Sequence, residues 1–190
     1  MRADYRVVLD ACVLIPMPLA DTLLRMAEHP RLYLPKWSQQ ILDEVSRNLS
    51  SKWNMSTEKV ERRENALRSH FPEAMVEGFE PLADLMSNDP GDRHVLAAAV
   101  PCNAELIVTF NRRHFPPESL EQWQVEVQGP STFLRGLYDL EPGLFIQKLH
   151  AQADAIGVHT PSLLSALAKN APSFVEYLCE ETGIELEPGP

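Results

Sequence analysis

Residues 6–10 read Arg-Val-Val-Leu-Asp, an aliphatic run that ends in a carboxylate. β-branched and aliphatic runs of this length predict a buried strand. A second run, Leu-Ile-Val-Thr, covers residues 106–109 and is soon followed by Asn111. In an open parallel sheet, ligands bind just beyond the carboxyl ends of the strands. The two runs therefore predict a site to which neighbouring strands deliver polar groups.

Helical patterns alternate with these strands. Ser38 is a favourable N-cap for a helix that runs to about Leu49 and has an apolar stripe at Ile41, Leu42 and Val45. Pro16 and Pro18 delay the start of the helix that follows the first strand. The alternation predicts an α/β fold with a parallel sheet. Further predicted elements are helices over residues 19–28 and 57–71, a strand over 32–35 and a short edge strand at 126–127.

Two of the predicted helices carry carboxylates near one end. Glu44 flanks the apolar stripe of its helix. Asp43 precedes it by one position on the same helix, so its side chain points in a different direction. Asp89-Pro90 predicts the start of another helix, with Pro at its first position. Asp89 then suits a capping role, while Asp92 is open to capping or to function. The small residues 97–99 would let this helix pack closely on the sheet and bring Asp92 to the strand ends.

Carboxylates gathered at one sheet edge repel one another unless a cation lies between them. Oxygen ligands of this kind suit Mg²⁺ or Mn²⁺, and such a site is typical of metal-assisted phosphodiester cleavage. Asp10 alone could simply cap the next turn. A phosphatase would usually have a second Asp at the position of Cys12. No Gly-rich loop follows the first strand, which argues against a dinucleotide site.

The remaining polar candidates have weaker cases. Thr109 and Asn111 end a strand, and Asn111 could either turn the chain or offer an uncharged oxygen to a metal. His114 is interpreted as a loop residue, and a packed or surface role is favoured for His94.

The length and composition of the chain indicate its cellular location and its affinity for nucleic acid. The chain has 190 residues, and no apolar run approaches the ~20 residues that span a bilayer. The N-terminus lacks the pattern of a signal peptide. Three widely spaced cysteines fit a reducing cytoplasm. The net charge of −10 makes the chain a poor non-specific binder of nucleic acid, although basic residues cluster at 62–63 and 112–114.

From about Glu141 the pattern changes to short amphipathic pieces that Pro161 and Pro172 separate. This pattern predicts two parts, a domain over residues 1–140 and a small helical C-terminal appendage over 141–190 that ends in a loose tail. The apolar residues of the appendage must be buried against the core, a second copy of the chain or another protein.

Taken in order, the four polar segments resemble a PIN-domain nuclease, and the resemblance covers about residues 5 to 135. VVLDACVLI places Asp10 on the first family acid, and ILDEVSRNL places Glu44 on the second. DPGDRHVLAAAV places Asp92 on the third. IVTFNRRHF places Thr109 on the usual Ser or Thr and Asn111 where many members have a fourth acid. Asn111 is thus a departure from the family pattern.

The resemblance implies a three-layer α/β/α sandwich around a central parallel sheet, with Mg²⁺ or Mn²⁺ held by Asp10, Glu44 and Asp92. Thr109 and Asn111 would orient water or phosphate. The resemblance is nearest to VapC-like toxins with a helical C-terminal extension. The resemblance to these toxins implies that the chain is a cytoplasmic endoribonuclease that cleaves single-stranded RNA. It also implies that the chain forms a homodimer and is inhibited by an antitoxin. Alternatives are a PIN scaffold that binds RNA or protein without cleaving, and a DNA nuclease, for which a long basic surface is lacking.

Overall fold

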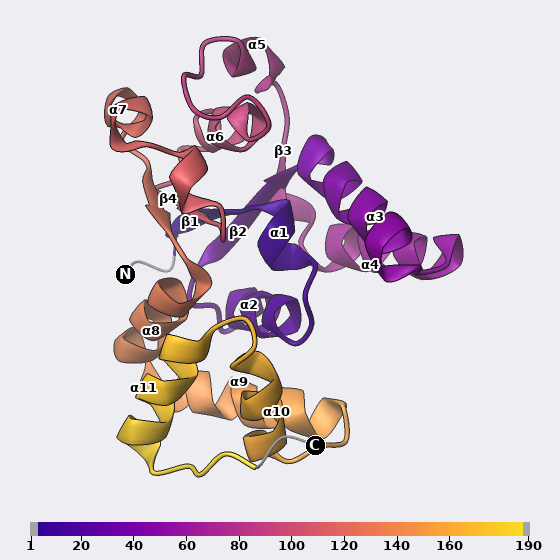
Figure 1. Cartoon of the computed structure of the whole chain (residues 1–190), viewed down its shortest axis with the longest axis vertical. Coiled ribbons are helices and arrows are strands. Elements are labelled where there is room, and N and C mark those ends of the chain that lie inside the picture. The colour runs from indigo at the N-terminus through magenta and orange to yellow at the C-terminus, as the bar shows by residue number, and fades with distance from the viewer. Residues whose placement is uncertain (1–3, 188–190) are drawn as a thin grey trace. The chain divides into compact units, whose positions relative to one another are not determined.

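The structure is a computed structural model that describes residues 4–187 (Figure 1). Its centre is a five-stranded sheet of order β3-β2-β1-β4-β5, and all four neighbouring pairs are parallel. The predicted α/β fold with a parallel sheet is therefore confirmed, and helices follow it in the C-terminal part, as predicted. The strands are β1 (Arg6–Leu9), β2 (Leu34–Ser38), β3 (Met75–Val76), β4 (Leu106–Val108) and β5 (Glu126–Gln128).

The chain divides into two compact units. The sheet unit contains residues 4–15 and 34–128, and the helical unit contains residues 16–33 and those from 129 onward. The predicted boundary at residue 140 stays a prediction, and the second segment of the helical unit begins at Gly129.

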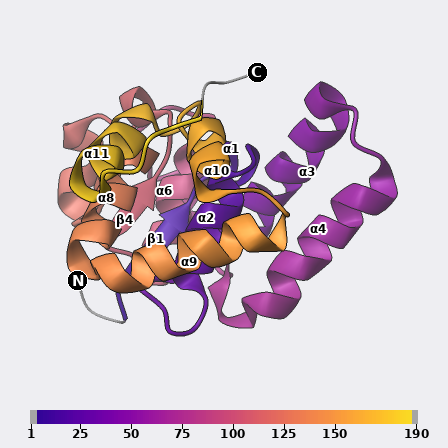
Figure 2. The ribbon, with the colours of Figure 1, turned by 90° about the horizontal axis from the view of Figure 1, so that it is seen from below.

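The helices of the sheet unit hold the candidate acids in place. The hydroxyl of Ser38 accepts a hydrogen bond from the N–H of Ile41 at 3.3 Å, so the predicted helix cap is confirmed. This helix, α3, packs against α4 (Figure 2). Residues 97–99 of α6 are buried, and α6 packs against β1, β2 and β4, so the predicted packing of this helix on the sheet is confirmed. The helices are α1 (Ala11–Leu14), α3 (Gln39–Trp53), α4 (Thr57–His70), α5 (Glu80–Ala83), α6 (Arg93–Ala99) and α7 (Pro117–Leu120).

Several predicted element bounds are wrong, among them the end of α3, which lies at Trp53 and not near Leu49. β2 begins at Leu34, two residues later than predicted. The helix predicted to start at Asp89-Pro90 begins at Arg93. The cause is local, because one carboxylate oxygen of Asp89 accepts the N–H of Gly91 at 2.9 Å and its carbonyl accepts the N–H of Asp92 at 2.9 Å. These bonds close a turn that delays the helix.

The helical unit has its own apolar core. Phe145 is fully buried and packs edge-on against Tyr138 and Phe174, with ring centroids 5.9 and 5.4 Å away. The hydroxyl of Thr22 donates to the side-chain oxygen of Gln152 at 2.9 Å in the same core. The members of the unit are α2 (Leu19–Ala27), α8 (Pro130–Leu140), α9 (Pro142–Ala155), α10 (Thr160–Leu167) and α11 (Pro172–Thr182).

Prolines open the C-terminal helices, as the sequence indicates. Pro161 and Pro172 lie in the first turns of α10 and α11. Most apolar residues of these helices are buried, so core packing accounts for them. Residues 183–187 form no helix or strand, and residues 188–190 of the predicted tail lie outside the described residues. Between residues 4 and 187, no helix combines the length and apolarity that a membrane crossing requires.

Candidate metal centre

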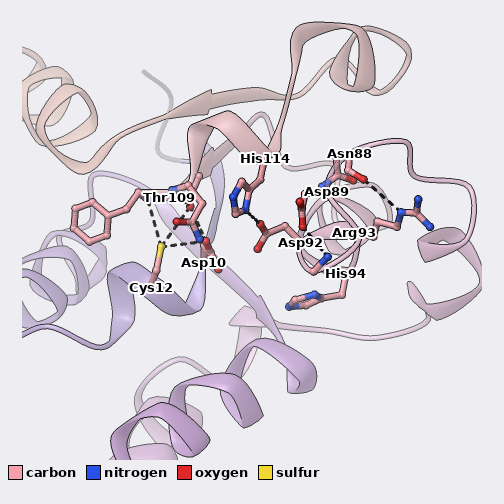
Figure 3. A network of polar contacts seen from close by, with 12 residues as sticks. Asp10, Cys12, Asn88, Asp89, Asp92, Arg93, His94, Thr109 and His114 are labelled. Atoms are coloured by element: carbon pink, nitrogen blue, oxygen red, sulfur yellow. Dashed lines mark hydrogen bonds and ion pairs between the residues drawn. The ribbon is translucent and has the colours of Figure 1, made fainter. Parts of the chain in front are cut away.

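Asp10 follows the central strand directly and is 1% exposed. Its N–H donates to the carbonyl of Val108 at 3.1 Å, which fixes it beside the end of β4. Its Oδ2 accepts two hydrogen bonds, from the hydroxyl of Thr109 at 2.6 Å and from the thiol of Cys12 at 3.1 Å (Figure 3). Both donors meet the same oxygen, so they orient the carboxylate from one side.

Thr109 and Cys12 also hold the loop that follows β4. The Thr109 hydroxyl accepts the N–H of Asn111 at 2.9 Å, and the Cys12 sulfur accepts the N–H of Phe110 at 3.3 Å. Burial and the charge of Asp10 raise the pKa of the Cys12 thiol, so it keeps the proton that it donates. The structure thus uses Thr109 to position Asp10. Asn111 itself is half-buried and lines a surface depression.

Asp92 stands at the N-terminus of α6, but its side chain makes no capping hydrogen bond to that helix. Its Oδ2 instead bonds to Nδ1 of His114, and its carboxylate points toward the end of the sheet (Figure 3). Burial raises the pKa of Asp92, the hydrogen bond from His114 opposes the rise, and the negative charge of Asp10 adds to it. The side chain of Asp92 therefore does not cap α6, and its predicted role as a metal ligand stays a prediction.

Glu44 reaches the same region from α3 and keeps about a third of its side chain exposed. Burial raises the pKa of Glu44, and the charges of Asp10 and Asp92 raise it further. The structure therefore brings the three predicted acids close enough to repel one another, although they come from separate segments of the chain.

Two histidines also border these acids. His94 is buried, and its Nε2 lies 3.8 Å from Oε2 of Glu44, which is too long for a hydrogen bond. Burial lowers the pKa of His94, which favours the neutral ring. The hydrogen bond to Asp92 raises the pKa of His114. The packed role predicted for His94 agrees with its burial, but the loop position of His114 gave no sign of its contact with Asp92.

Asp89, Asp92 and His114 can each offer a ligand atom, and these atoms lie within 4.8 Å of one another. Carboxylate oxygens suit Mg²⁺ and Mn²⁺. Burial is the first cause of the raised pKa values of Glu44 and Asp92, and the neighbouring acids add a repulsion that a cation would relieve. This group fits a divalent cation, but it contains only Asp92 of the three predicted ligands, so a single site shared by Asp10, Glu44 and Asp92 stays a prediction.

We expect Mn²⁺ to raise the melting temperature more at pH 7 than at pH 5. The folded-state pKa values of Glu44 and Asp92 are raised, so their stability contribution is present below the unfolded pKa and is lost as the pH rises through the folded pKa. A cation binds the ionised acids and restores that loss, whereas at pH 5 protons compete with it. At 100 times its Kd, Mn²⁺ should add roughly 5–10 °C at pH 7.

Differential scanning fluorimetry at both pH values checks this expectation, with NaCl of equal ionic strength as the control. Equal shifts at pH 5 and pH 7 would contradict binding through these acids.

Comparison with known proteins identifies the family of the chain. A family model described as the PIN domain matches residues 6–113, more than half of the chain. VapC50 of Mycobacterium tuberculosis, which is named as a candidate ribonuclease, is 39% identical over 104 residues. The aligned part is 53% of this chain and 62% of that protein, so it spans less than two thirds of the relative. No solved structure gives a significant match. The family match includes every predicted site residue from Asp10 to Asn111, and the chain belongs to the PIN-domain family.

Proposed function

We propose that this chain is a Mg²⁺- or Mn²⁺-dependent endoribonuclease that cleaves single-stranded RNA. The observation that carries the proposal is the buried carboxylate of Asp10 at the carboxyl ends of β1 and β4, held by Thr109 at 2.6 Å in a chain that matches the PIN-domain family. Burial first, and then the charges of neighbouring acids, raise the pKa values of Glu44 and Asp92, which supports placing these two acids near Asp10. The similarity to VapC50 supports the choice of RNA as substrate. We also propose that the protein is a cytoplasmic, homodimeric toxin that an antitoxin protein inhibits.

Asp10, Glu44 and Asp92 would hold the cation. When bound, the cation would lower the pKa of water and stabilise the charge that develops on the phosphate. Thr109 keeps the Asp10 carboxylate in one orientation through its 2.6 Å hydrogen bond. The amide of Asn111 can bond to water or to a phosphate oxygen without adding negative charge beside the RNA.

A catalytically weak scaffold that binds RNA or protein is the alternative. Two observations favour it, namely the amide of Asn111 in place of a fourth acid and the net charge of −10. Cleavage assays separate this scaffold from the nuclease, because both readings allow binding and only one allows turnover.

The test incubates the wild-type protein and the Asp10→Asn variant with a panel of single-stranded RNAs in Mn²⁺, in Mg²⁺ and in EDTA. We expect the wild-type protein to cleave in either cation and not in EDTA. Asn keeps an oxygen that can accept from Thr109 but loses the charge that binds the cation, so Asp10→Asn should be inactive while folded. Duplex RNA and single-stranded DNA test the proposed substrate preference.

Two outcomes would count against the proposal. A wild-type protein that binds RNA without cutting it would support the scaffold. Cleavage that persists in Asp10→Asn would belong to another site or to a contaminant.

A further inference from the structure

Phe110 is an aromatic side chain that the fold leaves 43% exposed. It directly follows Thr109, and its backbone is held in place on both sides. The N–H of Thr109 donates to the carbonyl of Gln128 at 3.0 Å, and the N–H of Asn111 donates to the hydroxyl of Thr109 at 2.9 Å. Single exposed apolar residues are common in proteins, so exposure alone assigns no role to Phe110. Its surroundings are more informative.

The backbone of Phe110 is tied to the candidate metal centre through Cys12. The N–H of Phe110 donates to the Cys12 sulfur at 3.3 Å. The Cys12 thiol in turn donates to Oδ2 of Asp10 at 3.1 Å (Figure 3). Two successive hydrogen bonds therefore join the backbone of an exposed aromatic residue to a proposed catalytic carboxylate.

The depression beside this ring is basic although the chain as a whole is acidic. Phe110 lines it together with Asn111, Arg112, Arg113 and His114, and both arginines are exposed. The lining thus combines one aromatic face with positive charge.

This combination fits unpaired nucleic acid better than it fits a protein partner. Binding sites for single strands pair cationic groups, which take the phosphates, with aromatic rings on which bases stack. A protein partner would be expected to meet a wider apolar patch, whereas the other residues that line this depression are polar or cationic. A duplex keeps the faces of its bases stacked and offers none to the ring.

We propose that Phe110 is a stacking platform for one unpaired base of the substrate RNA, and that Arg112 and Arg113 bind the phosphates beside that base. The inference rests on the proposed ribonuclease function and names the feature that would select single strands. It also accounts for RNA binding by a chain with a net charge of −10.

The first test compares Phe110→Leu and Phe110→Trp with the wild-type protein, using a 5′-labelled single-stranded RNA of 12 nucleotides. Anisotropy in EDTA gives the Kd without cleavage, and steady-state cleavage in Mn²⁺ gives KM and kcat. Phe110→Leu should weaken binding roughly 5- to 150-fold, equivalent to about 1–3 kcal/mol, and raise KM more than it lowers kcat. Phe110→Trp should bind at least as well as the wild-type protein. Trp53→Leu is the matched control, because Trp53 is a 59% exposed aromatic residue on α3.

A second measurement scans one abasic site along the RNA. The wild-type protein should lose affinity at one position, and Phe110→Leu should be indifferent to the missing base there. Arg112→Gln and Arg113→Gln should each reduce the slope of log Kd against log salt by roughly 0.7.

The outcomes separate the two proposals. If the wild-type protein cleaves RNA and Phe110→Leu binds it equally well, the stacking platform is refuted and the ribonuclease stands. If Phe110→Leu keeps its RNA affinity but changes the oligomeric state, Phe110 is a protein contact and the platform is again refuted. A wild-type protein that neither binds nor cleaves RNA overturns both.

Discussion

Asp92→Asn is expected to lower kcat/KM for RNA cleavage on the order of 100-fold or more, and to change the free energy of unfolding by less than about 1 kcal/mol. The carboxylate makes no capping bond to α6, and an amide oxygen can still accept from His114. Burial is the largest cause of the raised pKa of Glu44, and removing the charge of Asp92 relieves part of the repulsion that adds to it. Single-turnover cleavage in Mn²⁺ and urea unfolding in EDTA measure the two quantities.

Asp43→Asn provides the matched control for this experiment. Asp43 is an exposed acid adjacent to Glu44 in sequence, and its Oδ1 accepts from Gln39 at 2.7 Å. We expect this variant to remain active. An active Asp92→Asn protein would mean that Asp92 only supports the turn before α6, and a strongly destabilised one would mean that its role is structural.

Phe145→Ala is expected to destabilise the helical unit by about 3–5 kcal/mol. The ring is fully buried and packs edge-on against Tyr138 and Phe174, so truncation leaves a large cavity in a small core. Ile156→Ala is the control, because Ile156 is 54% exposed and its truncation should cost little. Urea unfolding followed by circular dichroism compares the two variants. A loss below about 1 kcal/mol in Phe145→Ala would show that the ring does not anchor this core.

The Phe145→Ala variant also tests whether metal binding depends on the helical unit. Asp10, Glu44 and Asp92 all belong to the sheet unit, and none of the proposed metal ligands comes from the helical unit. We therefore expect Phe145→Ala to bind Mn²⁺ with wild-type affinity at a temperature where it remains folded. Calorimetric titration checks this, and weaker binding would place a substrate- or cation-handling role in the C-terminal helices.

Local chemistry made much of the sheet unit predictable. The aliphatic run at residues 6–9 and the cap at Ser38 are decided by neighbouring residues, and both predictions are confirmed. β3 has only two residues and exists through its pairing with β2, so no pattern marks it. The start of α6 depends on a side chain–backbone bond within the turn at Asp89, which overrides the preference of Pro90 for a first helical position.

Some residues of the candidate site were likewise predictable from local sequence, and others depend on tertiary contacts. Asp10 and Thr109 were predicted because they end buried strands, and their hydrogen bond joins them in the structure. The contact between Asp92 and His114 joins the turn before α6 to the segment after β4. The hydrophobic periodicity of the sequence does not predict how these two segments are placed. The helical pieces after residue 141 were predictable, but their shared unit with α2 joins segments that are far apart in sequence.

The pairing of β1 with β4 has a consequence for synthesis in the cell. The hydrogen bond from Thr109 to Asp10 joins residues 99 positions apart, and Asp10 lies beside Val108. A ribosome adding 5–20 residues per second needs roughly 5–20 s to make the residues between them. Until then the N-terminal acid has neither of these partners. The Asp10 carboxylate is therefore positioned only after more than half of the polypeptide, through Thr109, has been translated.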